Sequence, residues 1–223
     1  GPTVYNHAHI GNLSSYIYAD ILRRTLKQCF GTTKHVMNIT DVDDKTIRDS
    51  LAKYPDQPPR QALQRLTDHY QQIFLDEMRA VGNSIDDITL VKATDSIAEI
   101  QRLILKLLEQ KIAYVASDGI YFSVDTYAKK RQYGQLSHID LHSHHQERIV
   151  NDEYDKDNPS DFALWKKQKP GEPAWGFTLA DGTHLAGRPG WHIECSVMSS
   201  HNLGQPFDIH TGGVDLIFPH HEN

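Results

Sequence analysis

The sequence predicts an α/β fold with a parallel sheet, and the first 40 residues carry the evidence. Residues 3–5 (Thr-Val-Tyr) have the β-branched and aromatic character of a strand, and residues 35–39 read as a second one. Between them, apolar residues recur at intervals of about 3.6 positions, the period of an α-helix, and Gly31 follows as a stop signal. A strand–helix–strand order at this spacing is typical of a βαβ unit, whose two strands run parallel. The positions of the helical stripe are Leu13, Ile17, Ile21, Leu22, Leu26 and Phe30.

Two further helices should follow and contribute to the core. Residues 55–59 (Pro-Asp-Gln-Pro-Pro) interrupt the pattern, and Gly82 ends the first of these helices. The second helix has a strongly amphipathic pattern. The positions that we assign to the core are Leu63, Leu66, Tyr70, Ile73, Phe74 and Val81 in the first helix and Ile97, Ile100, Leu103, Ile104, Leu107 and Leu108 in the second.

The character of the sequence changes at Ala113. Residues 114–115 and 120–122 flank Ser-Asp-Gly at 117–119, which is a hairpin signal. Polar, His-rich, Asp-rich and Pro-rich stretches follow, interrupted by the strand-like residues 162–165. The pattern predicts a region with a small sheet of its own.

The helix and strand pattern of the main sheet resumes at Trp191, and we expect residues 207–210 to form its next strand. We therefore predict three regions. Residues 1–112 form the first half of a parallel-sheet domain, residues 113–189 form an insertion, and residues 190–223 belong to the second half.

Composition excludes some classes of protein. The chain has 223 residues, 39% of them apolar, and no apolar run approaches the roughly 20 residues that a membrane span needs. No charged stretch followed by an apolar one reads as a secretory signal, and two cysteines provide no disulfide framework. We expect a cytoplasmic protein without membrane contact, and a monomer.

The charge does not indicate nucleic-acid binding, because the formal net charge is −6. Any contact with RNA has to use local basic clusters, such as residues 129–131 (Lys-Lys-Arg) or 166–167 (Lys-Lys). The chain begins without Met and in the middle of a motif, so we expect it to be a fragment.

The turn at residues 9–12 (His-Ile-Gly-Asn) has the features of a phosphate-binding turn. It lies between the first strand and the first helix, where free backbone N–H groups and the helix dipole favour anions. Gly11 lets a ligand approach the backbone closely, and His9 and Asn12 on either side can donate to phosphate oxygens. This pattern favours a nucleotide triphosphate; the alternative is two surface polar groups at an ordinary turn.

A second turn, residues 212–215 (Gly-Gly-Val-Asp), follows the strand expected at 207–210. Ligands of open parallel sheets bind outside the carboxyl ends of the strands. Gly213 and its neighbour would let the chain bend around a nucleotide, and the carboxylate of Asp215 can accept ribose hydroxyls. A role in stabilising the turn is the alternative for Asp215.

Cys195 and His220 are the candidate metal ligands, since thiolate and imidazole together suit zinc. Judged from the residues alone, a small core residue is the preferred interpretation of Cys195, and we expect Cys29 to be packed. An acidic cluster invites a magnesium site, but carboxylates also favour a helix N-terminus, and we prefer the capping interpretation. That cluster consists of Asp41, Asp43 and Asp44.

Several motifs are long enough to be compared with known families. They are Gly-Pro-Thr-Val-Tyr at 1–5, Asn-Ile-Thr-Asp-Val-Asp-Asp-Lys at 38–45, Asp-Phe-Ala-Leu-Trp-Lys at 161–166, Gly-Arg-Pro-Gly-Trp-His-Ile-Glu-Cys at 187–195, Asp-Ile-His-Thr-Gly-Gly-Val-Asp at 208–215 and Leu-Ile-Phe-Pro-His-His-Glu-Asn at 216–223. Together with the His9 turn they resemble cysteinyl-tRNA synthetases, which are class I aminoacyl-tRNA synthetases. The resemblance runs from end to end in the family's order. The class signature usually ends in a second His where this chain has Asn12, a variant that these enzymes tolerate.

The resemblance implies a Rossmann-like nucleotide-binding domain split by a smaller connective-peptide insertion. It implies catalytic roles for His9 and Asn12. The residues implied in ATP binding are His9, Gly11, Asn12, Gly213 and Asp215. Those implied in the cysteine pocket are Thr40, Trp191 and His210, although Trp191 could instead be simple core.

The resemblance also implies one Zn²⁺ ion held by four ligands. These are a Cys just before Gly-Pro-Thr-Val-Tyr, a Cys matching Cys195, a His matching His220 and a Glu just after His-His-Glu-Asn. This chain contains only Cys195 and His220, so its site is incomplete and we expect weak metal binding. His221 and Glu222 are weak candidates to substitute.

The implied reaction is activation of L-cysteine by ATP, accompanied by Mg²⁺, to cysteinyl-adenylate, followed by transfer to tRNA(Cys). Catalysis would consist mostly of positioning and charge stabilisation. The family's Lys-Met-Ser-Lys-Ser loop and anticodon region lie beyond Asn223, so we expect the chain alone to be a poor catalyst.

Three alternatives remain. A paralogous ligase would couple cysteine to an amino sugar through the same adenylate. A non-catalytic nucleotide-binding module would lack the reaction. A zinc hydrolase would use His192, Glu194, His220, His221 and Glu222, but the chain has no His-Glu-x-x-His helix.

Overall fold

The computed structural model describes residues 1–136, 160–217 and 219–223. The chain divides into two compact units. Unit 1 comprises residues 1–96, 171–173 and 198–211, and unit 2 comprises residues 97–170, 174–197 and 212–223. The division into residues 1–112, 113–189 and 190–223, which the sequence analysis proposed, stays a prediction.

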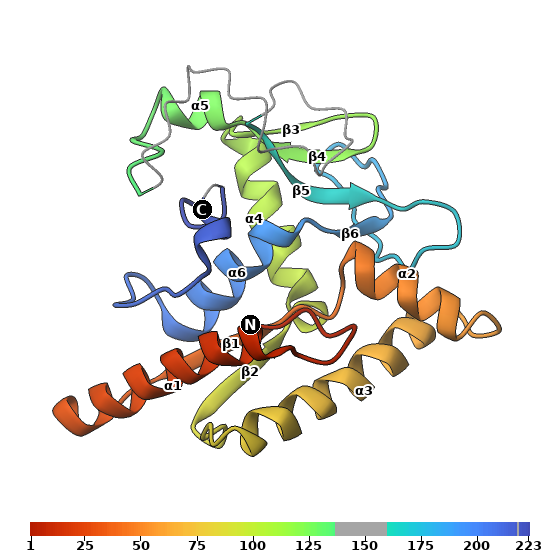
Figure 1. The fold of residues 1–223 in the computed structure, drawn as a ribbon. Coiled ribbons are helices and arrows are strands. Elements are labelled where there is room, and N and C mark those ends of the chain that lie inside the picture. The colour runs from red at the N-terminus through yellow and green to blue at the C-terminus, as the bar shows by residue number, and fades with distance from the viewer. Residues whose placement is uncertain (137–159, 218) are drawn as a thin grey trace. The chain divides into compact units, whose positions relative to one another are not determined.

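Unit 1 holds the parallel sheet and its helices. Its elements are α1 (Ile10–Phe30), β1 (His35–Ile39), α2 (Asp44–Lys53), α3 (Pro59–Ala80), β2 (Ile88–Lys92) and the 3₁₀ helix η1 (Thr94–Ser96) (Figure 1).

Strand β1 has a parallel neighbour on each side. It pairs with β2 in a register that places His35 opposite Ile88. On the other side Thr3 forms a parallel bridge with Thr40, whose N–H donates to Pro2 O at 2.9 Å. The predicted parallel arrangement of the first unit is therefore confirmed, although residues 3–5 contribute a single bridge instead of a full strand.

Helices α2 and α3 lie side by side and are joined by the proline-rich break at 55–59 (Figure 1). Pro59 is the first residue of α3, where a missing N–H costs nothing because that group has no partner inside the helix. Leu63, Leu66 and Phe74 are buried, as the helical stripe predicts. The core cluster of this unit consists of Leu13, Met37, Phe74, Met78 and Ile85.

Helix α1 departs from its predicted apolar stripe. Leu13 is buried, but Ile21, Leu22 and Phe30 are exposed. Cys29 is also exposed, so the expectation that it packs is wrong. The reason is that the inner face of α1 buries an ion pair, whereas the predicted stripe assigned apolar side chains to that face.

Asp20 and Arg23 form this buried pair. Arg23 Nη2 donates to Asp20 Oδ1 at 2.6 Å and to the carbonyl of Ser84 at 2.7 Å, which ties α1 to the segment after α3. Arg24, more than half exposed, donates to the second carboxylate oxygen at 2.7 Å. Burial alone would raise the pKa of Asp20, but the hydrogen bonds and charges of Arg23 and Arg24 outweigh it and lower that pKa.

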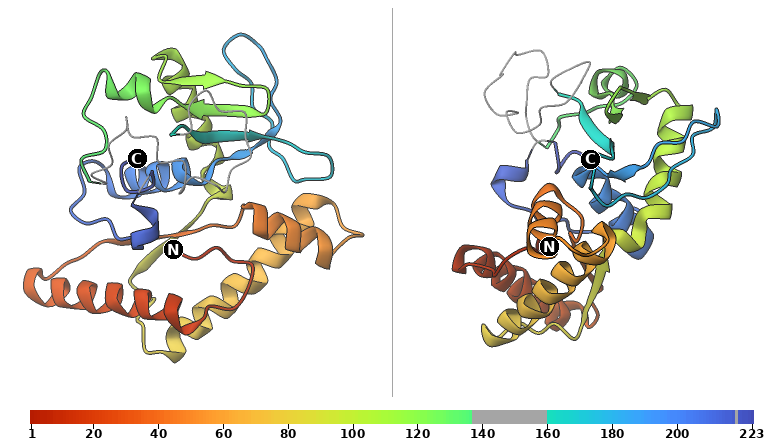
Figure 2. Two further views of the ribbon diagram at one scale, coloured as in Figure 1. Left: turned by 45° about the horizontal axis from the view of Figure 1, so that its top comes forward. Right: turned by 90° about the vertical axis from the view of Figure 1, so that its right-hand side faces the viewer.

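Unit 2 is built around an antiparallel sheet in the order β3-β4-β5-β6, whose strands lie next to one another in Figure 2. The predicted hairpin is confirmed by β3 and β4, and residues 162–165 lie in β5. Trp165 and Phe177 pack edge to face in the core of this unit. The elements are α4 (Ile97–Glu109), β3 (Ala113–Val115), β4 (Gly119–Phe122), α5 (Val124–Ala128), β5 (Phe162–Lys167), β6 (Gly187–Pro189), the first half of α6 (Trp191–Leu203) and η2 (Val214–Leu216).

The strand expected at residues 207–210 does not form. A strand needs a hydrogen-bonded neighbour, and no ladder among the described residues includes this segment. Within the part of the chain that the structure describes, no helix is both long and apolar enough to cross a membrane.

Removing the carboxylate of the buried pair should destabilise the fold. We expect Asp20→Ala to lower the free energy of unfolding by about 3 kcal/mol or more, because Arg23 would stay buried without its main partner. Arg24→Ala, at the exposed end of the same network, should cost about 0–1 kcal/mol. Urea unfolding followed by circular dichroism would measure both, and equal effects of the two substitutions would contradict the assignment.

Candidate active site

The His9 turn caps helix α1. The N–H of Gly11 donates to His9 Nδ1 at 3.1 Å, and the N–H of His9 donates to Asn12 Oδ1 at 3.3 Å, so the two side chains form a reciprocal capping box. A Cβ at position 11 would lie 2.9 Å from Cε1 of the His9 ring, so a larger residue there would require the capping imidazole to shift.

This cap fixes the tautomer of His9. Because Nδ1 accepts a hydrogen bond, the ring proton of the neutral imidazole lies on Nε2. The side chain is exposed, so Nε2–H can donate to a ligand without breaking the cap. Asn12 accepts through its oxygen and likewise does not spend its Nδ2 donors on the cap. The turn can therefore cap its helix and offer donors to an anion at once.

Glu77 of α3 holds the approach to this turn. Its Oε1 lies 2.7 Å from His7 Nδ1, and its Oε2 accepts from the N–H of Ala8 at 3.1 Å. One carboxylate thus fixes the two residues that precede His9. Both contacts lie within unit 1.

The carboxyl ends of β1 and β2 carry the next predicted residues. Thr40 is buried, and its Oγ1 accepts from Asn38 Nδ2 at 3.2 Å. Asp41 is also buried and accepts from Thr94 at the end of β2, from the backbone N–H at 3.0 Å and from Oγ1 at 2.5 Å. Burial raises the pKa of Asp41, and the hydrogen bonds from Thr94 oppose this only in part.

The other two carboxylates of the acidic cluster serve helix α2. Asp43 is its N-cap and accepts from the N–H of Lys45 at 2.8 Å, and Asp44 lies in the first turn. The capping interpretation is therefore confirmed for these two, whereas Asp41 joins two strand ends.

In unit 2, three side chains meet at the start of α6. The imidazole of His220 stacks on the indole of Trp191, with ring centroids 4.8 Å apart and planes 13° from parallel. On a second side, Nδ1 of His192 lies 3.2 Å from Nδ1 of His220. Nδ1 of His220 therefore faces the imidazole of His192.

Cys195 shares a helix face with these residues. It follows Trp191 by four positions and His192 by three, and residues at those spacings are neighbours on a helix surface. Cys195 is half-buried, and burial raises the pKa of its thiol to about 11. A thiol in that state stays protonated at neutral pH unless a cation lies beside it.

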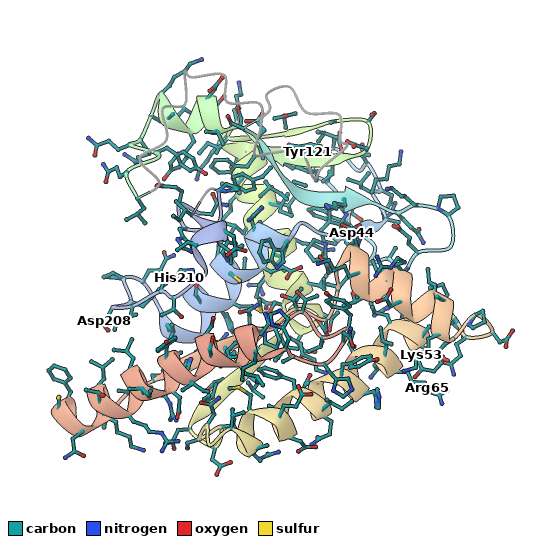
Figure 3. The ribbon with its side chains drawn as sticks, in the orientation of Figure 1. Asp44, Lys53, Arg65, Tyr121, Asp208 and His210 are labelled. Carbon is teal, nitrogen blue, oxygen red and sulfur yellow. The ribbon has the colours of Figure 1, made fainter. Side chains whose placement is uncertain are left out.

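The remaining predicted residues are exposed. His210 lies on the segment that follows α6 (Figure 3) and is solvent-accessible. Gly213 precedes η2, and Asp215 lies within that short helix, also exposed. Asp215 therefore does not follow a strand, since the strand expected before it is absent.

Comparison with known proteins gives a consistent result. The profile of the family described as tRNA synthetases class I (C) catalytic domain matches residues 1–223. Similar proteins named cysteine–tRNA ligase occur in Koribacter versatilis (46% identical over 224 residues) and Pyrococcus horikoshii (45% over 223 residues). Both alignments cover the whole of this chain, but only 42% and 44% of those proteins.

The chain belongs to the class I tRNA synthetases, in the family of the cysteine-type catalytic domain. It spans less than half the length of these curated relatives. The Rossmann-like α/β fold class inferred from the sequence agrees with this membership.

The predicted site residues of this synthetase domain are divided between the two units. His9, Gly11 and Asn12 share one turn in unit 1, where Thr40 and His210 also belong. Unit 2 contains the other five, which are Trp191, Cys195, Gly213, Asp215 and His220. No group of three or more His, Cys, Asp or Glu side chains suited to a metal ion occurs among the described residues of the domain.

Sequence analysis missed two side chains that organise these groups. Glu77 gave no signal, because its contact with residues 7–8 crosses about 70 positions of the chain. His192 was considered only for a hydrolase, although its spacing of three from Cys195 could have placed both on one helix face.

The buried carboxyl of Asp41 should make stability depend on pH in a definite direction. Its pKa is raised in the fold above the ordinary value of 3.8, so protonation favours the folded state. The contribution of Asp41 to the free energy of unfolding should rise as pH falls through the folded pKa and level off below 3.8. Asp41→Asn can keep both contacts with Thr94 and does not titrate. Its stability relative to the native protein should therefore fall as the pH is lowered, which urea titrations between about pH 7 and 4 would measure; a constant difference would contradict the assignment.

Proposed function

We propose that the full-length protein is a cysteine–tRNA ligase that activates L-cysteine with ATP and Mg²⁺ and transfers it to tRNA(Cys). The observation that carries the proposal is the convergence of Trp191, His192 and His220 on the helix face that bears Cys195. These are aromatic, imidazole and thiol groups, which suit a small thiol substrate bound beside a soft metal ion. Relatives named cysteine–tRNA ligase along the whole chain favour this function over an amino-sugar ligase, a hydrolase or a binding module.

The His9 turn would hold the phosphates of ATP. The Nε2–H of His9 and the amide nitrogen of Asn12 are donors at a helix N-terminus, and Gly11 leaves the backbone accessible. When the cysteine carboxylate attacks the α-phosphorus, negative charge develops on the phosphate oxygens. Donors fixed in advance by the cap stabilise that charge without reorganising. Gly213 and Asp215 are proposed ribose contacts.

Cys195 and His220 fit a zinc ion by donor type, since zinc prefers thiolate and imidazole. The ion would bind the substrate thiolate and thereby discriminate against serine, whose hydroxyl is a harder and less acidic donor. Cys195 would supply a second thiolate once a cation lowers its high pKa. Thr40 and His210 are proposed as further residues of the cysteine pocket.

The tRNA contact and the compartment follow from the proposed activity. Residues 129–131 are exposed and basic, which suits a contact with the phosphate backbone. A cytoplasmic location and a monomeric state complete the proposal.

Substitutions at His9 can separate capping from catalysis. In the full-length protein, His9→Asn should keep the cap of α1, since Asn is a good N-cap, and should leave thermal stability near the native value. It lacks the Nε2 donor and should slow adenylate formation by about 10²- to 10³-fold. His9→Gln, whose amide nitrogen can reach a similar point, should recover part of the rate and lose about 1 kcal/mol of cap energy. Rapid-quench adenylation and thermal unfolding would measure the two effects; a native rate in His9→Asn would exclude the phosphate role.

Substitution of Cys195 should affect cysteine and not ATP. Cys195→Ser in the full-length protein replaces a soft donor by a hard one, so zinc content and zinc affinity should drop markedly. The KM for cysteine in cysteine-dependent ATP–pyrophosphate exchange should rise by about tenfold or more, whereas the KM for ATP should change little. Cys29→Ser, at the exposed cysteine, is the matched control. Equal zinc content in the two variants would leave Cys195 as a packing residue.

A further inference from the structure

We propose that Glu222 is a positioning residue whose carboxylate fastens the His220 segment to residues 133–136. This latch would hold the imidazole of His220 in place against Trp191. The role of His220 rests on the proposed function, whereas the latch itself does not.

The carboxylate of Glu222 binds two backbone groups that lie more than 80 positions away in the chain. Its Oε2 accepts from the N–H of Gly134 at 3.0 Å, and its Oε1 accepts from the N–H of Leu136 at 2.6 Å. Hydrogen bonds to an ionised acceptor are about twice as strong as neutral ones, and using both oxygens fixes the orientation of the carboxylate.

The residues on either side strengthen this connection. Tyr133 donates through its hydroxyl to Asn223 Oδ1 at 2.8 Å. The Tyr133 ring packs edge to face on Tyr127, with centroids 5.7 Å apart, and near Phe122 at 6.3 Å. The latch is therefore attached to the aromatic part of the unit 2 core and not to a free loop.

A second set of bonds holds the other side of His220. The N–H of His221 donates to the carbonyl of Leu216 at 3.1 Å, and the N–H of Glu222 donates to that of Pro219 at 3.1 Å. At Gly212, a Cβ would lie 2.4 Å from His221 Nε2, so this backbone packs directly against the imidazole. His220 lies between these turn contacts and the Glu222 latch.

The arrangement assigns Glu222 a task other than metal binding. Both oxygens already accept charge-assisted bonds, and moving the carboxylate to a metal would leave the N–H of buried Gly134 without this partner. Glu222 therefore does not replace a missing zinc ligand. It acts through His220, as groups that orient a metal-binding imidazole do.

The test uses full-length protein with Glu222→Ala, Glu222→Gln and, as control, Glu109→Ala, which removes an exposed carboxylate of α4 in the same unit. Hydrogen–deuterium exchange of the peptide containing residues 133–136 should speed up in Glu222→Ala and not in the control. Zinc affinity, measured with a chromogenic chelator, should fall by about 10- to 100-fold, and the KM for cysteine should rise while that for ATP stays the same. Glu222→Gln retains one acceptor oxygen and should recover part of each effect.

The outcomes separate the latch from the proposed function. Unchanged exchange at 133–136 in both Glu222 variants would overturn the latch. Faster exchange with native zinc affinity would overturn the positioning role. If the native enzyme shows no cysteine-dependent ATP–pyrophosphate exchange, the proposed function is refuted. The hydrogen–deuterium exchange and the zinc affinity would still decide whether Glu222 acts as a latch and as a positioning residue. If Glu222→Ala does not fold, Glu222→Gln decides the same three measurements.

Discussion

The alternation of hydrogen bonds along β1 is the constraint on which unit 1 depends. Consecutive residues of a strand point their backbone groups to opposite sides, so Ile39 bonds to Ala93 after β2 and Thr40 bonds to residues 2–4. Three segments therefore run parallel and leave the sheet at one edge. Asp41 closes this edge by accepting from Thr94, and burial of that carboxyl is tolerated because both oxygens are bonded.

At the start of α1, the needs of the helix and of a ligand are compatible because they use different atoms. A helix N-terminus requires acceptors for its first N–H groups, whereas a phosphate requires donors. His9 and Asn12 each carry an acceptor and a donor. The acceptor, a ring nitrogen in His9 and an amide oxygen in Asn12, serves the cap, and an N–H is available for the ligand. An aspartate would cap equally well but its carboxylate would offer no donor, which gives a physical reason for imidazole and amide at these positions.

The sequence was sufficient for features that depend on local pattern. The parallel relation between residues 3–5 and β1, the α3 core positions and the β3–β4 hairpin follow from period and turn chemistry, and the structure has them. It was insufficient where polar contacts override the pattern. Asp20 and Arg23 take the inner face of α1, so Ile21 and Phe30, which fit an apolar stripe, are left exposed.

The candidate site shows the same division. The Asp43 cap and the His9 turn could be found from short motifs, because their partners lie within three residues. Glu77 and Glu222 could not be found in this way. The carboxylate of Glu77 binds a backbone N–H about 70 positions away, and that of Glu222 binds two that lie more than 80 positions away. Backbone groups are present at every position, so no pair of residue types marks such a contact in a single sequence.

Helix geometry also explains why the His220 segment needs so many anchors. Trp191, His192 and Cys195 are placed relative to one another by the helix alone, since spacings of three and four define a face. Among these four residues, His220 alone lies outside α6. Stacking on Trp191 fixes the distance between the two rings better than it fixes the rotation of the imidazole in its plane. The contact between the two Nδ1 atoms sets which ring nitrogen of His220 faces His192, and the turn contacts and the Glu222 latch fix the backbone that carries the ring. Precision at this site is therefore supplied mostly by groups that would touch neither metal nor substrate.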